Sequence, residues 1–224
     1  MINGTISVST LSVENDRLLD YIKELEFAKA DRLFCEVRDG LIGKPATFGE
    51  GGVAVIKSST SLPVDVRLMV YQPHKHLAKY LKKKPDSILV QYEHFSKEKQ
   101  LRKALQRIQR KHVRSGLILG TAIPISYILP FIPYVDEIMI LGTDQDEGEI
   151  EQNIFDKISN LLELKKKFKK DLVISVRGGV TFANCNKLFE AGVNVLVVDK
   201  IVYDSFSKSH TIENLKNPNS TLVK

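Results

Sequence analysis

Short apolar runs alternate along the chain with longer segments in which apolar residues recur every three or four positions. The short runs are typical of buried strands, and the longer segments are typical of amphipathic helices. Strands are predicted at residues 4–10, 33–40, 63–70, 87–93, 115–124, 136–143, 171–179 and 193–202. Helices are predicted at residues 14–30, 53–59, 74–84, 97–112, 153–170 and 184–192. This alternation indicates eight parallel β/α units.

The first predicted strand is not followed by a G-x-G-x-x-G sequence, which would indicate the dinucleotide crevice of an open, doubly wound sheet. We therefore predict an α/β fold with a single closed (β/α)8 barrel, a TIM barrel, over residues 1–206. Residues 207–224 are polar and are predicted to form a C-terminal tail with at most a short helix. In this fold, functional side chains gather at the carboxyl ends of the strands.

Two connections depart from the regular pattern. Residues 40–52 are rich in glycine and contain a proline, which is typical of a mobile loop that covers a site. Residues 125–134 are apolar but contain Pro130 and Pro133, so their helix is predicted to be short or broken.

Composition narrows the class of protein. The chain has 224 residues, 43% of them hydrophobic, which suits one core, and its net charge is +6. The basic residues concentrate at 79–84, 97–112 and 163–170, where they predict solvated helix faces rather than nucleic-acid binding. No apolar run is long enough for a membrane span, and the start lacks the pattern of a secretion signal. Cys35 and Cys185 lie far apart, which favours reduced buried thiols and a cytoplasmic protein.

Candidate chemistry appears first in the second predicted strand. Alternation places Phe34, Glu36 and Arg38 on one face of this strand. An isolated carboxylate is costly to bury, so Glu36 needs a positively charged partner. Arg67 and Arg177 are each the basic residue of another apolar strand. The three charges therefore predict either a functional site or a structural ion cluster.

Several sequence segments carry a family resemblance in their order and spacing. They are STLS at 9–12, EVRDG at 36–40, TFG at 47–49, PVDVRLMV at 63–70, GLILGTAIP at 116–124, VRGGV at 176–180 and AGVNVLVVDKIVY at 191–203. Together they resemble the ribulose-phosphate 3-epimerase family over about residues 4–203. The resemblance implies a barrel of the ribulose-phosphate-binding type and a ligand that is a phosphorylated sugar.

The resemblance also implies a divalent metal held by two histidines and two aspartates, the aspartates serving as acid and base. The corresponding positions in this chain are Phe34, Glu36, Arg67 and Arg177. A phenyl ring and guanidinium groups do not coordinate metals, because arginine stays protonated and only donates hydrogen bonds. We therefore expect no metal cofactor.

The phosphate-binding end departs from the family pattern as well. The family's glycine-rich loop after the sixth strand corresponds here to residues 144–151, which include five acidic residues, and its Gly-Ser after the eighth strand corresponds to Asp199 and Lys200. Gly178, Gly179 and Ser9 are retained. The expected catalytic residues are Glu36, Arg67 and Arg177. The expected substrate-binding residues are Ser9, Arg38, Met69, Gly178, Gly179 and Lys200.

Two functions remain open at this stage. The first is a divergent epimerase-like barrel that binds a sugar phosphate or a similar anionic metabolite without metal-dependent epimerase activity. The alternative is a metal-independent phosphosugar isomerase or epimerase of carbohydrate metabolism that uses Glu36 as its base, with Arg67 and Arg177 stabilising an enediolate. The structural alternative is that Glu36, Arg67 and Arg177 form an ion cluster that fills the space of a lost site. We expect neither nucleic acid nor a membrane as partner, and homo-oligomerisation is left open.

Overall fold

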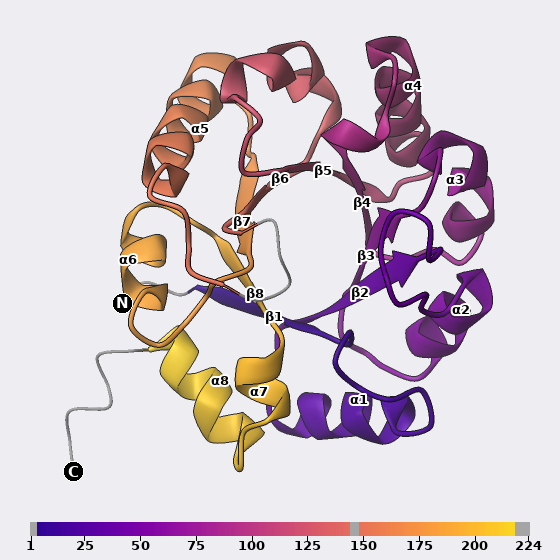
Figure 1. Ribbon diagram of the computed structural model, residues 1–224, viewed down its shortest axis with the longest axis vertical. Helices are drawn as coiled ribbons and strands as arrows, with labels where there is room; N and C mark the ends of the chain where they lie inside the picture. Colours follow the sequence, from indigo (N-terminus) through magenta and orange to yellow (C-terminus); the bar gives the residue numbers. More distant parts are fainter. Residues whose placement is uncertain (1–3, 144–147, 218–224) are drawn as a thin grey trace.

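A computed structural model describes residues 4–143 and 148–217 and shows a closed barrel of parallel strands (Figure 1). Each strand pairs with the next one along the chain, and the last pairs with the first, Thr5 lying opposite Val195. The predicted TIM barrel is therefore confirmed. The strands are β1 (Thr5–Ser9), β2 (Arg32–Arg38), β3 (Val64–Met69), β4 (Ser87–Gln91), β5 (Arg114–Leu119), β6 (Glu137–Leu141), β7 (Val173–Arg177) and β8 (Val195–Val198).

Helices surround the barrel (Figure 1). They are α1 (Leu18–Phe27), α2 (Glu50–Ser58), α3 (Pro73–Leu81), α4 (Glu98–Gln109), α5 (Ile154–Phe168), α6 (Cys185–Glu190), α7 (Lys200–Tyr203) and α8 (Lys208–Lys216). Two 3-10 helices, η1 (Tyr92–His94) and η2 (Ile125–Tyr134), follow β4 and β5. The second contains Pro130 and Pro133, in agreement with the predicted broken helix. Among the described residues, no helix has the length and apolar character needed to cross a membrane.

The strands bury both faces. One face packs against the surrounding helices, and the other fills the barrel interior with side chains that include Phe34, Leu89, Ile118 and Met139. Gly116 leaves space for this filling, because a Cβ atom there would lie 2.4 Å from Cγ of Leu89. The interior is thus a packed core that supports whatever lies at its ends.

The C-terminal segment contains a short helix. Residues 208–216 form α8, with Thr211, Ile212 and Leu215 buried. The Lys216 ammonium group contacts Asp31 Oδ1 at 2.7 Å and donates to the carbonyl of Lys29 at 2.9 Å. The few apolar residues of this segment suffice to dock a helix, and the domain boundary at residue 206 stays a prediction. The final residues, 218–224, lie outside the described part of the chain.

The eighth strand is shorter than predicted. It ends at Val198, and residues 200–203 form α7 instead of continuing the strand. The carbonyl of Asp199 accepts hydrogen bonds from the amides of Val202 and Tyr203, which starts the helix directly after the barrel wall. Asp199 and Lys200 therefore lie at the rim of the barrel rather than within a strand.

Both cysteines are buried free thiols, Cys35 on β2 and Cys185 at the start of α6. Burial raises the pKa of the Cys35 thiol to about 12. The prediction that both thiols are buried is confirmed, and the raised pKa makes Cys35 a packing residue rather than a nucleophile.

Candidate functional site

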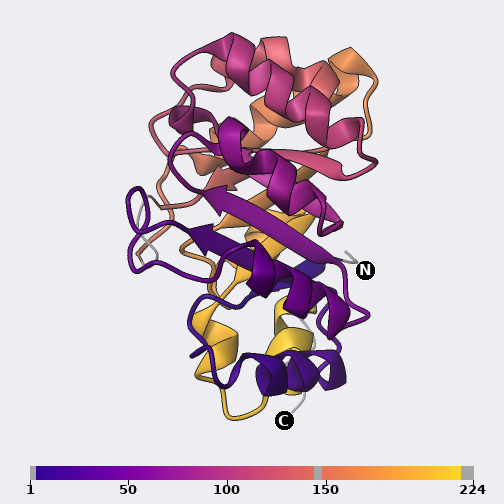
Figure 2. The same ribbon diagram turned by 90° about the vertical axis from the view of Figure 1, so that its right-hand side faces the viewer.

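A cavity of about 690 Å³ lies at the carboxyl ends of β1, β2, β7 and β8. Figure 2 shows β2 and β3 pointing in the same direction, with the loop 40–49 beyond their carboxyl ends. The wall of the cavity includes seven residues that were predicted from the sequence for the site, namely Ser9, Glu36, Arg38, Arg177, Gly178, Gly179 and Lys200. The end of the barrel at which the fold places function is therefore the end at which these residues meet.

Glu36 lies at the centre of an ion cluster on the cavity side of the barrel. Its Oε1 atom accepts a hydrogen bond from Arg38 Nε at 2.6 Å. Its Oε2 atom lies 3.0 Å from Arg67 Nη1 and 3.0 Å from Arg177 Nη2. The prediction that Glu36 lies between Arg67 and Arg177 is confirmed, and Arg38 adds a third guanidinium group. We call Glu36, Arg38, Arg67 and Arg177 the mouth cluster.

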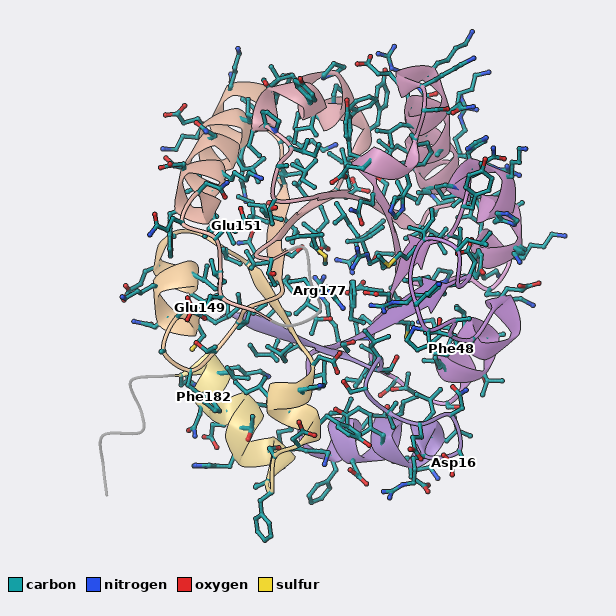
Figure 3. All side chains as sticks on the ribbon, viewed as in Figure 1. Asp16, Phe48, Glu149, Glu151, Arg177 and Phe182 are labelled. Carbon is teal, nitrogen blue, oxygen red and sulfur yellow. The ribbon has the colours of Figure 1, made fainter. Side chains whose placement is uncertain are left out.

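Strand register explains the cluster. Glu36 and Arg67 are directly paired across β2 and β3, so their side chains point to the same face. Arg38 follows Glu36 by two positions on that face. Arg177, the last residue of β7, reaches the cluster from the other side, and Figure 3 shows it near the middle of the barrel.

The mouth cluster gathers positive charge beside the cavity. Burial alone raises the pKa of the Glu36 carboxyl, but the positive charges of Arg177, Arg67 and Arg38 outweigh burial and hold this pKa below its usual range. Glu36 thus contacts three guanidinium groups. Two of them, those of Arg38 and Arg177, line the cavity, and guanidinium groups in such a position favour an anionic ligand.

Two predicted residues lie behind the cavity wall. Arg67 directs its Nη2 atom toward Gln91 Oε1 at 2.6 Å. Met69 lies under the loop, where a Cβ atom at Gly43 would come within 2.6 Å of its sulfur. Neither residue is among the described residues that line the cavity. Ligand contact by Met69 stays a prediction, and Arg67 reaches the cavity wall through Glu36.

The loop after β2 is fastened to the mouth cluster at its second half. Arg38 Nη1 donates to the carbonyl of Lys44 at 2.7 Å, and the Thr47 hydroxyl donates to the carbonyl of Glu36 at 2.8 Å. Residues 45–48 consequently form part of the cavity wall, and Figure 3 shows Phe48 on the side of α2. That this loop acts as a lid stays a prediction.

The opposite wall is formed by the turn after β7. Gly178 and Gly179 adopt φ angles of +89° and +70°, which side chains rarely tolerate, and a Cβ atom at Gly178 would lie 2.8 Å from Thr143 Cγ2. Glycine at these positions lets the turn approach the end of β6 closely. Of the predicted acidic loop, residues 144–147 lie outside the described residues, whereas Gly148 lines the cavity.

Asp199 is a cavity residue that the sequence analysis did not assign to the site. Burial raises the pKa of its carboxyl group, although hydrogen bonds from Ser12 and Ser9 and the positive charge of Arg177 act in the opposite direction. Both serines also line the cavity. In the sequence, Asp199 is marked only as a carboxylate that follows an apolar strand. Whether it lies in the cavity wall depends on where that strand ends.

The family's metal-ligand positions do not fit a divalent cation in this chain. The Phe34 ring lies 6.0 Å from the guanidinium carbon of Arg177, and both oxygens of Glu36 already contact arginines. Arginine offers no lone pair to a metal. Within the described residues, no group of three or more His, Cys, Asp and Glu side chains is placed to hold a metal ion.

Fold and site together define a (β/α)8 barrel with a small-molecule cavity at its carboxyl-terminal mouth. The sequence profile of the Ribulose-phosphate 3 epimerase family matches residues 5–203. The chain belongs to this family. It is 29% identical to the chloroplastic ribulose-5-phosphate-3-epimerase of Arabidopsis thaliana, over 94% of this chain and 75% of the relative. It is 27% identical to the ribulose-phosphate 3-epimerase of Bacillus subtilis, over 94% of this chain and 97% of the relative.

Solved structures of other proteins share the fold. KGPDC from Streptococcus mutans, in a complex with a sugar phosphate, matches with a TM-score of 0.74 and 10% identity over 97% of each chain. The 3-hexulose-6-phosphate synthase from Salmonella typhimurium matches with a TM-score of 0.71 and 12% identity, over 95% of this chain and 96% of the other. At these identities the likeness concerns the fold alone.

Proposed function

We propose that this protein binds a sugar phosphate, or a closely similar anionic metabolite, in the cavity at the barrel mouth, without metal-dependent epimerase activity. The observation that carries the proposal is the mouth cluster, in which three guanidinium groups share one carboxylate beside the cavity. Arg177 and Arg38 line the cavity, and a guanidinium group forms charge-assisted hydrogen bonds with an anion such as a phosphate.

The remaining wall suits the rest of such a ligand. The Ser9 hydroxyl accepts a hydrogen bond from the Leu11 amide at 3.1 Å, which leaves its proton for a ligand or a neighbouring acceptor. The turn at Gly178 and Gly179 allows close approach of a ligand to the backbone. The cavity volume of about 690 Å³ lies in the usual range for small-molecule sites. Family membership and the ligand of the Streptococcus mutans structure support a sugar phosphate.

The alternative function, a metal-independent isomerase or epimerase with Glu36 as its base, fits the geometry less well. A general base needs a free lone pair and a pKa near the working pH. Both oxygens of Glu36 are held by arginines, and its pKa is lowered. We therefore assign Glu36 to holding the arginines in place rather than to proton transfer.

Calorimetric titration tests the binding proposal. Ribulose 5-phosphate and fructose 6-phosphate are the ligands, with inorganic phosphate and unphosphorylated ribulose as comparisons. We expect at least one sugar phosphate to bind at least tenfold more tightly than inorganic phosphate, because hydroxyl groups and phosphate contact the wall together. Equal affinity for inorganic phosphate and every sugar phosphate, or no binding of any of them, would contradict the proposal.

Elemental analysis tests the proposed metal independence. The purified protein is expected to contain no stoichiometric zinc, iron or manganese, since the four ligand positions hold one carboxylate, two guanidinium groups and a phenyl ring. About one metal ion per chain, removable by a chelator with loss of epimerase turnover, would refute this part of the proposal. We also propose a cytoplasmic location, which the two buried free thiols support.

A further inference from the structure

We propose that the outer side of α3 and α4 binds the phosphate backbone of a double-stranded nucleic acid without reading its bases. This surface lies outside the described cavity wall, so the inference does not depend on the proposed function. We call it the basic face. Its cationic residues are Lys75, Lys79, Lys82, Lys83 and Lys84 on and directly after α3, and Lys97, Lys99, Arg102, Lys103, Arg107, Arg110 and Lys111 on and beside α4.

Positive charge is concentrated in these two segments of the chain. Residues 73–84 and 97–112 hold twelve Lys and Arg and a single acidic residue, Glu98. All other residues together hold 21 Lys and Arg against 26 Asp and Glu. The net charge of +6 therefore comes from the two segments, and the rest of the protein is net negative. Such an asymmetry is typical of a surface that binds a polyanion.

The fold joins the two segments into one surface. α3 and α4 follow neighbouring strands and contact each other outside the barrel (Figure 1). Each helix buries its apolar side, which includes Leu77 on α3 and Leu101 on α4, and Figure 3 shows long side chains of both helices extending away from the barrel. From sequence alone, each helix predicts a solvated face and no nucleic-acid partner. Their contact changes this expectation, because it doubles the width of the positive surface.

Protein groups neutralise little of the charge on the basic face. In the described part of the chain, Lys79 is the one residue of the twelve that forms an ion pair, at 3.0 Å from Glu50 Oε2. The basic end of α5 is different, because Lys165 lies 3.4 Å from Asp171 and Lys170 donates to two backbone carbonyls of η2. The basic face therefore keeps its charge for an external anion, whereas α5 uses part of its charge within the protein.

The spacing of the cations on α4 suits a row of phosphates. Lys99, Lys103, Arg107 and Arg110 recur every three or four residues on the exposed side of the helix. At 1.5 Å per residue, this row is roughly 16 Å long. Over that length, one strand of a double helix presents about five phosphates. Lysine and arginine both donate charge-assisted hydrogen bonds to phosphate oxygens.

The side chains that surround the cations argue against other partners. None of the exposed large apolar side chains lies on α3 or α4. A membrane-binding helix inserts such side chains into the lipid, and a protein interface usually has an apolar centre. Single strands are bound by stacking their bases on aromatic rings, but Tyr80 of α3 is buried and α4 has no aromatic residue. The phosphates of a duplex need none of these groups.

Fluorescence anisotropy tests the inference with labelled DNA and RNA duplexes of about 20 base pairs, each in two unrelated sequences. We expect similar affinities for the two sequences and a steep loss with salt, because each neutralised phosphate adds about 0.9 to the slope of log affinity against log salt. The tighter duplex identifies DNA or RNA as the partner. R102Q/K103Q/R107Q should weaken binding at least tenfold and reduce the slope by about 2–3.

The matched control is K165Q/K166Q/K167Q at the end of α5, which removes the same charge and should bind like the unchanged protein. A second test variant, K82Q/K83Q, should also weaken binding, because these lysines belong to the basic face. Glutamine is a good helix former, so we expect all three variants to unfold at the same temperature as the unchanged protein. Calorimetric titration of R102Q/K103Q/R107Q with a sugar phosphate should be unchanged, which separates this inference from the proposed function.

Several results would overturn the inference. They are failure of both duplexes to bind at about 50 mM salt, equal losses in the α4 and α5 triple variants, and unchanged binding in K82Q/K83Q. Binding of polyglutamate or of phosphatidylserine vesicles at least as tightly as a duplex would also overturn it, and would assign the basic face to an acidic protein segment or to a membrane surface. The proposed binding of a sugar phosphate at the barrel mouth would stand in each case.

Discussion

The two ends of the barrel each hold an ion cluster, and the two clusters differ in their share of arginines and carboxylates. At the amino ends of the strands, Arg114 Nη2 lies 3.0 Å from Asp65 Oδ1, and Arg32 Nη1 lies 3.4 Å from Glu137 Oε2 and 3.6 Å from Asp65 Oδ2. We call Arg32, Asp65, Arg114 and Glu137 the floor cluster. It contains two arginines and two carboxylates, whereas the mouth cluster contains three arginines and one.

Two serine hydroxyl groups donate hydrogen bonds to the carboxylates of the floor cluster. Ser87 donates to Asp65 at 2.6 Å, and Ser175 donates to Glu137 at 2.7 Å. Its charges therefore find partners within the protein, as in a structural ion cluster. The mouth cluster instead lies beside the cavity and gathers three guanidinium groups around one carboxylate. The comparison separates a cluster that holds the barrel together from the cluster beside which we propose that a ligand binds.

Removal of the central carboxylate should give the largest effect. E36Q leaves three buried guanidinium groups without their shared anion, so we expect a loss of about 3–5 kcal/mol in the free energy of unfolding. The measurement is urea denaturation at neutral pH. The matched change in the floor cluster is E137Q, which should cost less, because burial raises the pKa of Glu137 and the fold therefore stabilises its charged form less than that of Glu36. Equal losses for both variants would remove the distinction between the clusters.

Ligand affinity should depend on one cluster only. R177Q removes a charged donor from the cavity wall, and charged hydrogen bonds contribute about 1.5–3 kcal/mol. We therefore expect the affinity for a sugar phosphate to fall at least tenfold in calorimetric titration. R114Q, in the floor cluster, should leave that affinity unchanged. A loss of affinity in R114Q as large as that in R177Q would argue against a ligand at the mouth.

The pH dependence of stability should have opposite signs at the two ends. The folded-state pKa of Glu36 lies below the reference value of 4.5, so its stabilisation is complete above pH 4.5 and is lost as the pH falls through the folded-state value. The folded-state pKa of Glu137 lies above 4.5, so its contribution is complete below pH 4.5 and is lost as the pH rises through the folded-state value.

Urea denaturation at several pH values measures this difference. The loss in free energy of unfolding caused by E36Q should shrink as the pH falls below 4.5. The free energy of unfolding of E137Q should rise relative to that of the unchanged protein as the pH rises above 4.5. Parallel pH profiles for the two variants would show that the clusters do not differ in the expected way.

The smallest effect is a change in the rate of proteolytic cleavage, which we expect in the loop between β2 and α2. In its first half the amides of Leu41 and Ile42 donate to the Asp39 carboxylate, while the Leu41 side chain is 75% exposed. We expect limited proteolysis of the free protein to cut between residues 40 and 44, and a bound sugar phosphate to slow this cleavage by ordering the loop. Cleavage at the same rate with and without every sugar phosphate tried would show that the loop is simply packed structure.

The fold and the mouth cluster were predictable from sequence for physical reasons. Parallel β/α units bury both faces of each strand, so their apolar runs are conspicuous. The side-chain period of two fixed which face of β2 carries Glu36, and an unpaired buried carboxylate demanded arginine partners. The third contact, from Arg38, was not predicted, because it depends on how the arginine side chain folds back along its own strand.

Asp199 and Met69 show where prediction from sequence stops. A strand that continued to residue 202 would have kept Asp199 in the barrel wall, and the turn into α7 after Val198 instead brings it to the cavity. Met69 occupies the expected register position, but the loop at Gly43 covers it. Both outcomes depend on where a connection leaves its strand, and a pattern of apolar residues defines that point only to within a few positions.

The pairing of β1 with β8 has a consequence for how the protein is made. The partner of Thr5 is Val195, so β1 has an open edge until nearly the whole chain has left the ribosome. At ordinary synthesis rates of about 5–20 residues per second, that edge stays unpaired for roughly 10 to 40 s. Exposed strand edges invite pairing with other chains. The newly synthesised protein therefore passes through a period in which this strand edge is open to pairing with other chains.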